Sequence, residues 1–163
     1  MPGATKQSES RQINFESRPN NYLKIHALDD FTQTEFIKYY VWVPDTLPLR
    51  DKIEILAGQV SQLIFRNSPI RLLEISKQGN TQIAIINLSE PAGNDRKPWA
   101  QGYFQGSAGG GMTTFALRET FLQRDFQGEW VDGVEFYYEG KPIYGWDHLL
   151  LNGRFFRDKN SDP

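Results

Sequence analysis

The chain has 163 residues, which suits one domain, and its 18 basic and 20 acidic residues leave a net charge of −2. Because the basic and acidic residues nearly cancel, the chain lacks the positive field that attracts nucleic acid or an anionic membrane. There is no cysteine, so disulfides, thiolate nucleophiles and cysteine-ligated metals are excluded. With 11 Phe, 7 Tyr and 4 Trp the chain can still bury one core. No stretch reaches the roughly 20 apolar residues of a membrane-spanning helix.

Polar residues dominate both ends of the chain. Residues 1–21 carry only Ile13 and Phe15 as apolar anchors, so we predict a disordered leader or tether there. They contain no apolar signal region, which indicates a cytoplasmic protein or a mature or truncated form. Residues 22–158 are expected to form a single domain, and residues 159–163 a frayed tail.

The first half of the domain predicts two strands and a helix. Tyr22 to Leu28 alternates apolar and polar residues, and Glu35 to Val43 is dense in β-branched and aromatic side chains, so both are predicted strands. Pro48 suits a first helical turn, because its missing N–H needs no partner there. From Pro48 to about Phe65 the apolar residues recur at helical spacing. These residues are Leu49, Ile53, Leu56, Val60, Leu63 and Ile64.

Two β-rich runs follow, Ile70 to Ser76 and Thr81 to Leu88, and they predict an antiparallel hairpin in which Gly79 supplies a positive φ. Next comes a long connection, Ser89 to Gly111, and connections of this length are uncommon unless they have a use. Part of it is expected to pack, because three aromatic residues punctuate it: Trp99, Tyr103 and Phe104.

The second half predicts a more deeply buried helix and a further strand. Met112 to about Arg124 carries apolar residues on two sides of a helix. Val134 to Tyr138 is a predicted strand, with Val134, Phe136 and Tyr138 on one face. Glu139-Gly140 turns the chain after it.

From Glu35 onward the element order is therefore β-α-β-β-α-β, followed by a terminal hairpin at Asn152-Gly153 that joins His148–Leu151 to Arg154–Phe156. Helices interleaved with mainly antiparallel strands predict a two-layer α+β fold with two helices packed on one face of the sheet. Six apolar residues are expected in the core: Leu56, Val60, Ile85, Phe115, Leu122 and Phe136.

A glycine-rich stretch precedes the second predicted helix, and backbone N–H groups at such a place are candidates for binding an anion or a nucleotide. The residues are Gly106, Ser107, Gly109, Gly110 and Gly111. The stretch matches neither glycine-rich phosphate-binding pattern, and no lysine follows the glycines. Close backbone packing is therefore favoured over a ligand loop.

Side chains able to do catalysis form no recognisable constellation. Asp147 and His148 are adjacent, but adjacent residues of a strand point to opposite faces, and no serine sits in a nucleophile elbow. His26 is the only other histidine, so the histidines give no metal signature. We predict no catalytic residue, no metal and no cofactor. Four carboxylates around the strand at 134–138 suit glycan cleavage, although a solvated strand face explains them more simply: Glu129, Asp132, Glu135 and Glu139.

Aromatic side chains supply the binding hypotheses. Trp99, Tyr103 and Phe104 are predicted to contribute to a partner-binding surface, because aromatic anchors dominate interfaces and a long loop that exposed them would otherwise be penalised. A wider set of aromatic residues is predicted to form a sugar-stacking or partner-binding surface, with core packing expected for at least half of its candidates. These candidates are Trp42, Trp99, Trp130, Trp146, Tyr137 and Tyr144.

Four short motifs occur in a familiar order. Asn87, Leu88 and Ser89 follow a predicted hairpin strand, Gly106-Ser107 opens a Gly/Ser loop, Thr120 lies in the helix, and Val134 to Lys141 covers the strand and its turn. Together they resemble the GerMN domain of sporulation and spore-germination proteins, loosely from Phe36 to Phe156. Two positions depart from the family pattern: Phe121 replaces an aliphatic residue, and Glu139 an aspartate.

The resemblance implies an α+β fold similar to the ring-building domains of secretion-type assemblies. It also implies a protein outside the cytoplasmic membrane, often anchored as a lipoprotein, without a catalytic centre. The missing signal and lipobox cysteine depart from that family. We therefore predict a non-catalytic protein-interaction or assembly domain of the bacterial cell envelope. It would bind protein partners or itself through sheet edges and exposed aromatic residues, not nucleic acid, and meet the membrane only through a tether not present in this chain. A glycan-binding or glycan-cleaving domain is the alternative.

Overall fold

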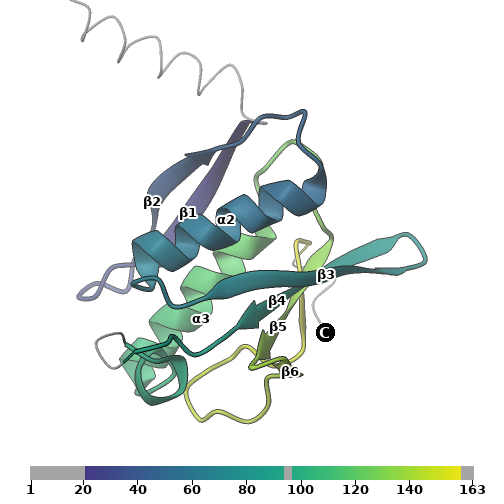
Figure 1. Ribbon diagram of the computed structural model, residues 1–163. Coiled ribbons are helices and arrows are strands. Elements are labelled where there is room, and N and C mark those ends of the chain that lie inside the picture. The colour runs from purple at the N-terminus through teal and green to yellow at the C-terminus, as the bar shows by residue number, and fades with distance from the viewer. Residues whose placement is uncertain (1–20, 94–96, 159–163) are drawn as a thin grey trace, which may run out of the picture.

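The computed structural model describes residues 21–93 and 97–158 and is shown in Figure 1. It has a two-layer α+β fold built from a two-stranded ribbon, a five-stranded mixed sheet and two long α-helices. The predicted tail and all of the predicted leader except Asn21 lie outside the described residues.

The ribbon consists of β1 (Tyr22–Leu28) and β2 (Glu35–Trp42), which pair antiparallel. Both strands were predicted from their β-rich sequence. The register shifts between Ile25 and His26, which leaves Lys38 of β2 as the extra residue of a β-bulge. Leu23, Ile25 and Val41 point from the ribbon into the core.

Helix α2 (Leu49–Ile64) has nearly the predicted bounds. Pro48 caps its first turn, where its carbonyl oxygen accepts hydrogen bonds from the N–H groups of Asp51 and Lys52. The predicted apolar stripe is buried at Ile53, Leu56 and Val60. Burial of this stripe, rather than the intrinsic helix propensity of its residues, supplies most of the stability of such a helix.

The five-stranded sheet contains β3 (Ile70–Gln78), β4 (Thr81–Leu88), β5 (Gly133–Tyr138), β6 (Lys141–Pro142) and β7 (Arg154–Phe156). Strands β3, β4, β5 and β6 pair in that order, and β7 pairs with β5 next to β6. The β4–β5 pair is parallel and the others are antiparallel. The predicted β3–β4 hairpin is confirmed, with Gly79 at φ 62°.

The predicted terminal hairpin is wrong. Asn152-Gly153 does turn the chain, with Gly153 at φ 83°, but 148–151 is not a strand. Instead β7 pairs with β5, and Phe155 enters the core opposite Val134. A local turn signal cannot distinguish pairing with the preceding residues from pairing with a more distant strand that offers a buried face.

The β4–β5 connection contains a π-helical turn, Trp99–Tyr103, and helix α3 (Ser107–Leu122). The helix begins five residues before the predicted Met112, so Gly109, Gly110 and Gly111 lie inside it. The sequence placed the start of the helix too far along the chain because glycine disfavours helix interiors by about 1 kcal/mol relative to alanine. Of the three glycines, only Gly110 lies close to another segment of the chain, at His148.

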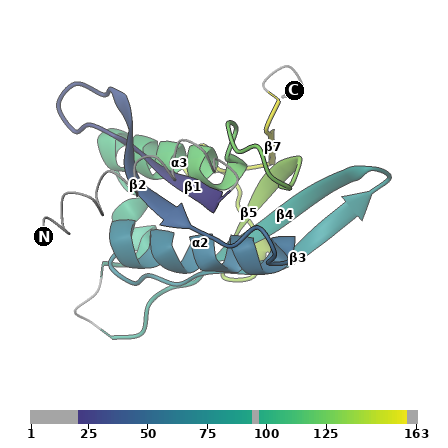
Figure 2. The same cartoon turned by 90° about the horizontal axis from the view of Figure 1, so that it is seen from above.

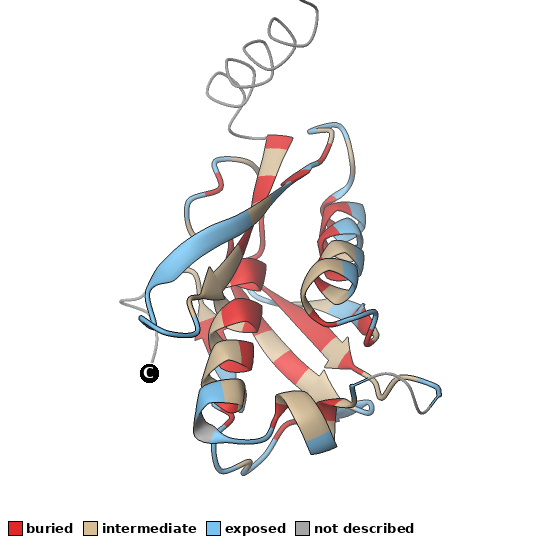
Figure 3. Cartoon of the chain, turned by 90° about the vertical axis from the view of Figure 1, so that its left-hand side faces the viewer, coloured by how far each residue is buried: buried red, intermediate tan, exposed pale blue. Residues whose placement is uncertain are grey.

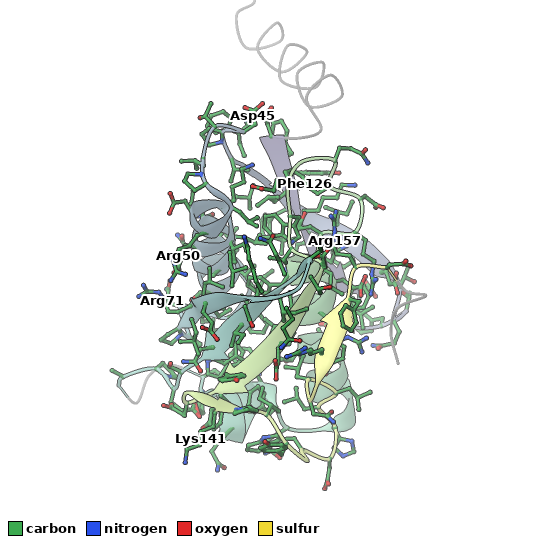
Figure 4. The ribbon with its side chains drawn as sticks, turned by 90° about the vertical axis from the view of Figure 1, so that its right-hand side faces the viewer. Asp45, Arg50, Arg71, Phe126, Lys141 and Arg157 are labelled. Atoms are coloured by element: carbon green, nitrogen blue, oxygen red, sulfur yellow. The ribbon has the colours of Figure 1, made fainter. Side chains whose placement is uncertain are left out.

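Both helices cover the same face of the five-stranded sheet, as predicted, because their buried residues share one core with one face of β4: Ala84, Ile86 and Leu88. Figure 2 shows α2 and α3 with β1 between them, and Figure 4 looks onto the opposite face of the sheet. Five of the six predicted core residues are buried, at 7% exposure or less. Phe115 is half-buried.

Candidate functional site

The glycine-rich stretch forms the N-terminal turns of α3, with Gly106 at φ 78° as the N-cap. A cavity beside it is lined by Gly106, Gly145, Trp146, Asp147 and His148, with no Lys or Arg among its lining residues. No cation is therefore placed there to hold a phosphate. The described residues give the ligand-loop prediction no further support, and the side chain of Ser107 lies outside them.

Gly110 has a packing role instead. A Cβ at this position would lie 2.3 Å from the carbonyl oxygen of His148, and real Cβ contacts are not that short. At Gly109 and Gly111 a Cβ would meet nothing within 4 Å. One glycine of the three is therefore required by the close approach of the segment that leads to β7.

The carboxylates near β5 are held in separate contacts. Glu135 forms an ion pair with Arg154 at 3.5 Å, and Asp132 accepts a hydrogen bond from the N–H of Gln82 at 2.8 Å. Glu139 accepts one from the N–H of Glu90 at 2.6 Å. Asp147 and His148 are exposed in the loop that follows β6. Within residues 21–93 and 97–158, no group of three or more His, Asp or Glu side chains is arranged to hold a metal ion.

Trp99 and Phe104 are core residues, so the prediction that they contact a partner is wrong for these two. Trp99 is fully buried and Phe104 is 2% exposed. Trp99 packs against Phe65 with ring centroids 4.8 Å apart, and Phe104 against Trp146 at 5.2 Å. Tyr103 lines a different surface cavity from Phe104, and partial burial raises the pKa of its hydroxyl.

Glu90 fixes this aromatic turn, a role that the sequence did not suggest. Its two carboxylate oxygens accept hydrogen bonds from the N–H groups of Trp99 at 2.6 Å and Ala100 at 3.1 Å. The hydroxyl of Tyr138 donates to the same carboxylate at 2.7 Å. Burial and this hydrogen bond raise the pKa of Tyr138. The carboxylate therefore satisfies backbone donors at the start of the turn, as an N-cap does, and joins it to β5.

Side chains of α3 and its C-cap cover the outer edge of β1. Gln123 accepts a hydrogen bond from the N–H of Lys24 at 3.0 Å and donates to the carbonyl of the same residue at 2.6 Å. Thr120, fully buried, accepts one from the N–H of His26 at 2.9 Å. These contacts replace the hydrogen bonds of a neighbouring strand, so they remove this edge as a site for pairing.

Within residues 21–93 and 97–158, the other strand of the ribbon, β2, pairs with β1 alone. Figure 3 shows most of this strand as exposed. Nine large hydrophobic side chains are exposed in the described residues, and five of them lie between residues 31 and 42. Apolar exposure is therefore concentrated on the ribbon, which points to a contact surface. The five are Phe31, Phe36, Ile37, Tyr40 and Trp42.

A cavity of about 400 Å³ lies between the β1–β2 turn, the end of α2 and the start of α3. Phe31 and Phe36 line it from the ribbon, Ile64 from α2, Tyr103 from the π-helical turn and Met112 from α3. Its size and mainly apolar lining are those of a binding pocket. The cavity and the exposed β2 residues form one candidate site. The sequence predicted binding through sheet edges and exposed aromatic residues and named Trp42, but it did not identify this cavity or this edge, because an apolar strand pattern does not show which side stays uncovered.

Comparison with protein-family models, with curated proteins and with solved structures finds no match to this chain. The resemblance to the GerMN domain therefore stays a prediction. Among the described residues, no helix combines the length and the apolar character needed to cross a bilayer.

Proposed function

We propose that this protein is a non-catalytic protein-interaction or assembly module that binds its partner through the β1–β2 ribbon. One observation carries the proposal: among the described residues β2 is an edge strand paired only with β1, and it lies within the part of the chain where exposed large apolar side chains are concentrated. The opposite edge of the same ribbon is closed by Thr120 and Gln123. A partner that paired with β2 would satisfy its backbone groups and cover its apolar side chains together.

The ribbon also carries a feature that limits indiscriminate pairing. The bulge at Lys38 interrupts the edge, and bulges and edge lysines are two ways in which proteins prevent edge-to-edge aggregation. Specificity must therefore come from side chains. Trp42, 56% exposed, is the largest exposed one on β2, and aromatic anchors of this kind dominate the binding energy of protein interfaces.

The cell-envelope location is part of this proposal. Its support is the resemblance of the motifs at 87–89, 106–107, 120 and 134–141 to the GerMN domain. In this proposal the domain acts outside the cytoplasmic membrane.

A crosslinking and pull-down comparison tests the interaction. Wild type is expected to capture a partner, or a second copy of itself, and Trp42→Ala to lose at least about tenfold in capture, as for an interface hot spot. Tyr144→Ala is the matched control, because Tyr144 is 76% exposed on a loop remote from the ribbon. Equal capture by wild type and Trp42→Ala would contradict the proposal.

A glycan-binding or glycan-cleaving domain is the second candidate, because exposed aromatic rings such as Trp42 and Tyr40 can stack on sugars. Assays on peptidoglycan fragments and chromogenic glycosides separate the two functions. Cleavage abolished by Glu135→Gln or Asp147→Asn would replace the interaction-module proposal with an enzyme.

A further inference from the structure

The cavity beside the ribbon shares its walls with the uncovered strand. Phe36 and Lys38 of β2 both line it, together with Leu28 and the β1–β2 turn. Phe36 lies opposite Ala27 in the ribbon, and Ala27 also lines the cavity. Side chains of neighbouring strands that lie opposite each other point to the same face of a sheet. A residue that paired with Phe36 on the free edge of β2 would therefore direct its side chain toward the cavity.

Hydrogen bonds of the turn above the cavity fix the backbone that carries an exposed phenylalanine. Asp29 Oδ1 accepts hydrogen bonds from the N–H groups of Phe31 and Thr32, both at 2.9 Å, and from the hydroxyl of Thr32 at 3.2 Å. The Asp29 N–H donates to the carbonyl of Thr34 at 2.9 Å. Phe31 is nonetheless 95% exposed. A turn organised in this way has already lost much of the conformational entropy that binding would otherwise cost.

Two lysines lie at the rim of the cavity. Lys97 lies with its ammonium 4.5 Å from the ring centroid of Tyr103, and its aliphatic stem crosses Gly102, where a Cβ would approach it to 2.7 Å. Neither Lys97 nor Lys38 forms an ion pair with another described residue. Asp29 and Asp30 also line the cavity, and the Asp29 carboxylate is held by hydrogen bonds of its own turn. The lining thus carries two lysines and two aspartates, and both ammonium groups remain available to an acidic side chain of a partner.

We propose that this cavity is the specificity pocket of the interaction surface: it receives one large apolar side chain of an extended partner segment paired with β2, and the rim lysines select an acidic residue beside that side chain. The inference rests on the proposed function and identifies the chemistry of the partner. A volume of about 400 Å³ accommodates one aromatic or large aliphatic side chain with room for its neighbour.

Glycine substitutions in α3 provide a matched test. Gly109 lines this cavity, Gly111 lines a different one, and a Cβ at either position meets no atom within 4 Å. Gly109→Leu therefore fills the pocket without a clash at its Cβ, while Gly111→Leu makes the same change to the same helix outside it. Urea melts of both variants are expected to show stability at or above that of wild type, because leucine favours helices more than glycine does.

The probe is a displayed library of random linear peptides of about ten residues, the length of a strand. Wild type is expected to enrich peptides with a Phe, Trp, Leu, Ile or Met next to or two residues from an Asp or Glu. A synthetic peptide with the enriched motif is expected to bind Gly109→Leu at least about tenfold more weakly than wild type. Gly111→Leu is expected to bind within a factor of about two of wild type. Lys97→Glu is expected to remove or reverse the preference for an acidic residue.

Three outcomes would overturn the inference: enrichment without an apolar residue, the same affinity for wild type and Gly109→Leu, or no enriched peptide. If one of them occurs while capture of a partner still depends on Trp42, the specificity pocket is wrong and the interaction module stands. If capture is also independent of Trp42, both are wrong.

Discussion

Arg124 and Arg157 each donate hydrogen bonds to backbone carbonyls in the segment around the other arginine. Arg124 Nη1 donates to the carbonyl oxygens of Phe156 at 2.9 Å and Arg157 at 2.6 Å. Arg157 Nη2 donates to the carbonyl oxygens of Gln123 at 2.6 Å and Phe126 at 2.8 Å. The pair therefore joins the residues after α3 to the residues that end β7, and Figure 4 labels Arg157 and Phe126 in this region.

Replacing Arg157 should destabilise the fold. Arg157→Met removes charge-assisted hydrogen bonds to carbonyls at the C-terminal end of α3, where a cation is favoured. We expect a loss of about 2–3 kcal/mol in urea unfolding. Arg154→Met is the control: Arg154 pairs with Glu135 on the open face of the sheet and is 39% exposed, so its loss should be about 1 kcal/mol or less. Equal losses for the two variants would mean that the Arg157 contacts contribute little.

Alanine substitutions at the glycines of α3 should change stability in opposite directions. Gly110→Ala places a Cβ 2.3 Å from the carbonyl oxygen of His148, so the helix or the 147–149 segment must shift. We expect a loss of about 1–3 kcal/mol, as for other overpacked sites. Gly109→Ala and Gly111→Ala meet no atom within 4 Å and should gain up to about 1 kcal/mol each from helix propensity. Thermal melts of the three variants check this order, and a stabilising Gly110→Ala would contradict the packing role.

The hydroxyl of Thr120 should be essential for stability. It accepts a hydrogen bond from the N–H of His26, so Thr120→Val leaves a partly buried backbone donor without its partner. We expect a loss of about 1–3 kcal/mol by urea denaturation, whereas Thr120→Ser keeps the acceptor and should lose less. Stability equal to wild type in Thr120→Val would show that packing of the methyl group suffices.

Thr120 also shows how much of the structure can be predicted from the sequence. Its burial follows from the helical pattern, but a hydroxyl in a helix is expected to bond to a carbonyl one turn earlier, whereas this one accepts a hydrogen bond from a strand 94 residues away in sequence. Strands, α2 and the two-layer architecture are predictable because periodicity is local. The pairing of β7 with β5, the burial of Trp99 and the uncovered edge of β2 depend on which distant segments meet. No local pattern contains that information.

His26 should make stability depend on pH. Burial disfavours the charged imidazole and lowers the pKa of His26 below its ordinary value of 6.5, although Glu119 opposes this shift. The unfolded chain therefore binds more protons than the folded chain between the two pKa values, so stability rises with pH there. The protein should lose stability as the pH falls below about 6.5, until the pH passes the folded pKa, with a slope of at most about 1.4 kcal/mol per pH unit from this group.

His26→Gln isolates the effect, because it keeps the backbone N–H that donates to Thr120 and removes the titrating ring. Urea melts of wild type and His26→Gln at about pH 7.5 and about pH 5.5 bracket the ordinary histidine pKa. Wild type should lose more stability than the variant between the two. The depressed pKa of Asp29, held down by hydrogen bonds from the N–H groups of Thr32 and Phe31, acts at lower pH and in both proteins, so it does not confuse the comparison. Parallel losses in the two proteins would contradict the assignment to His26.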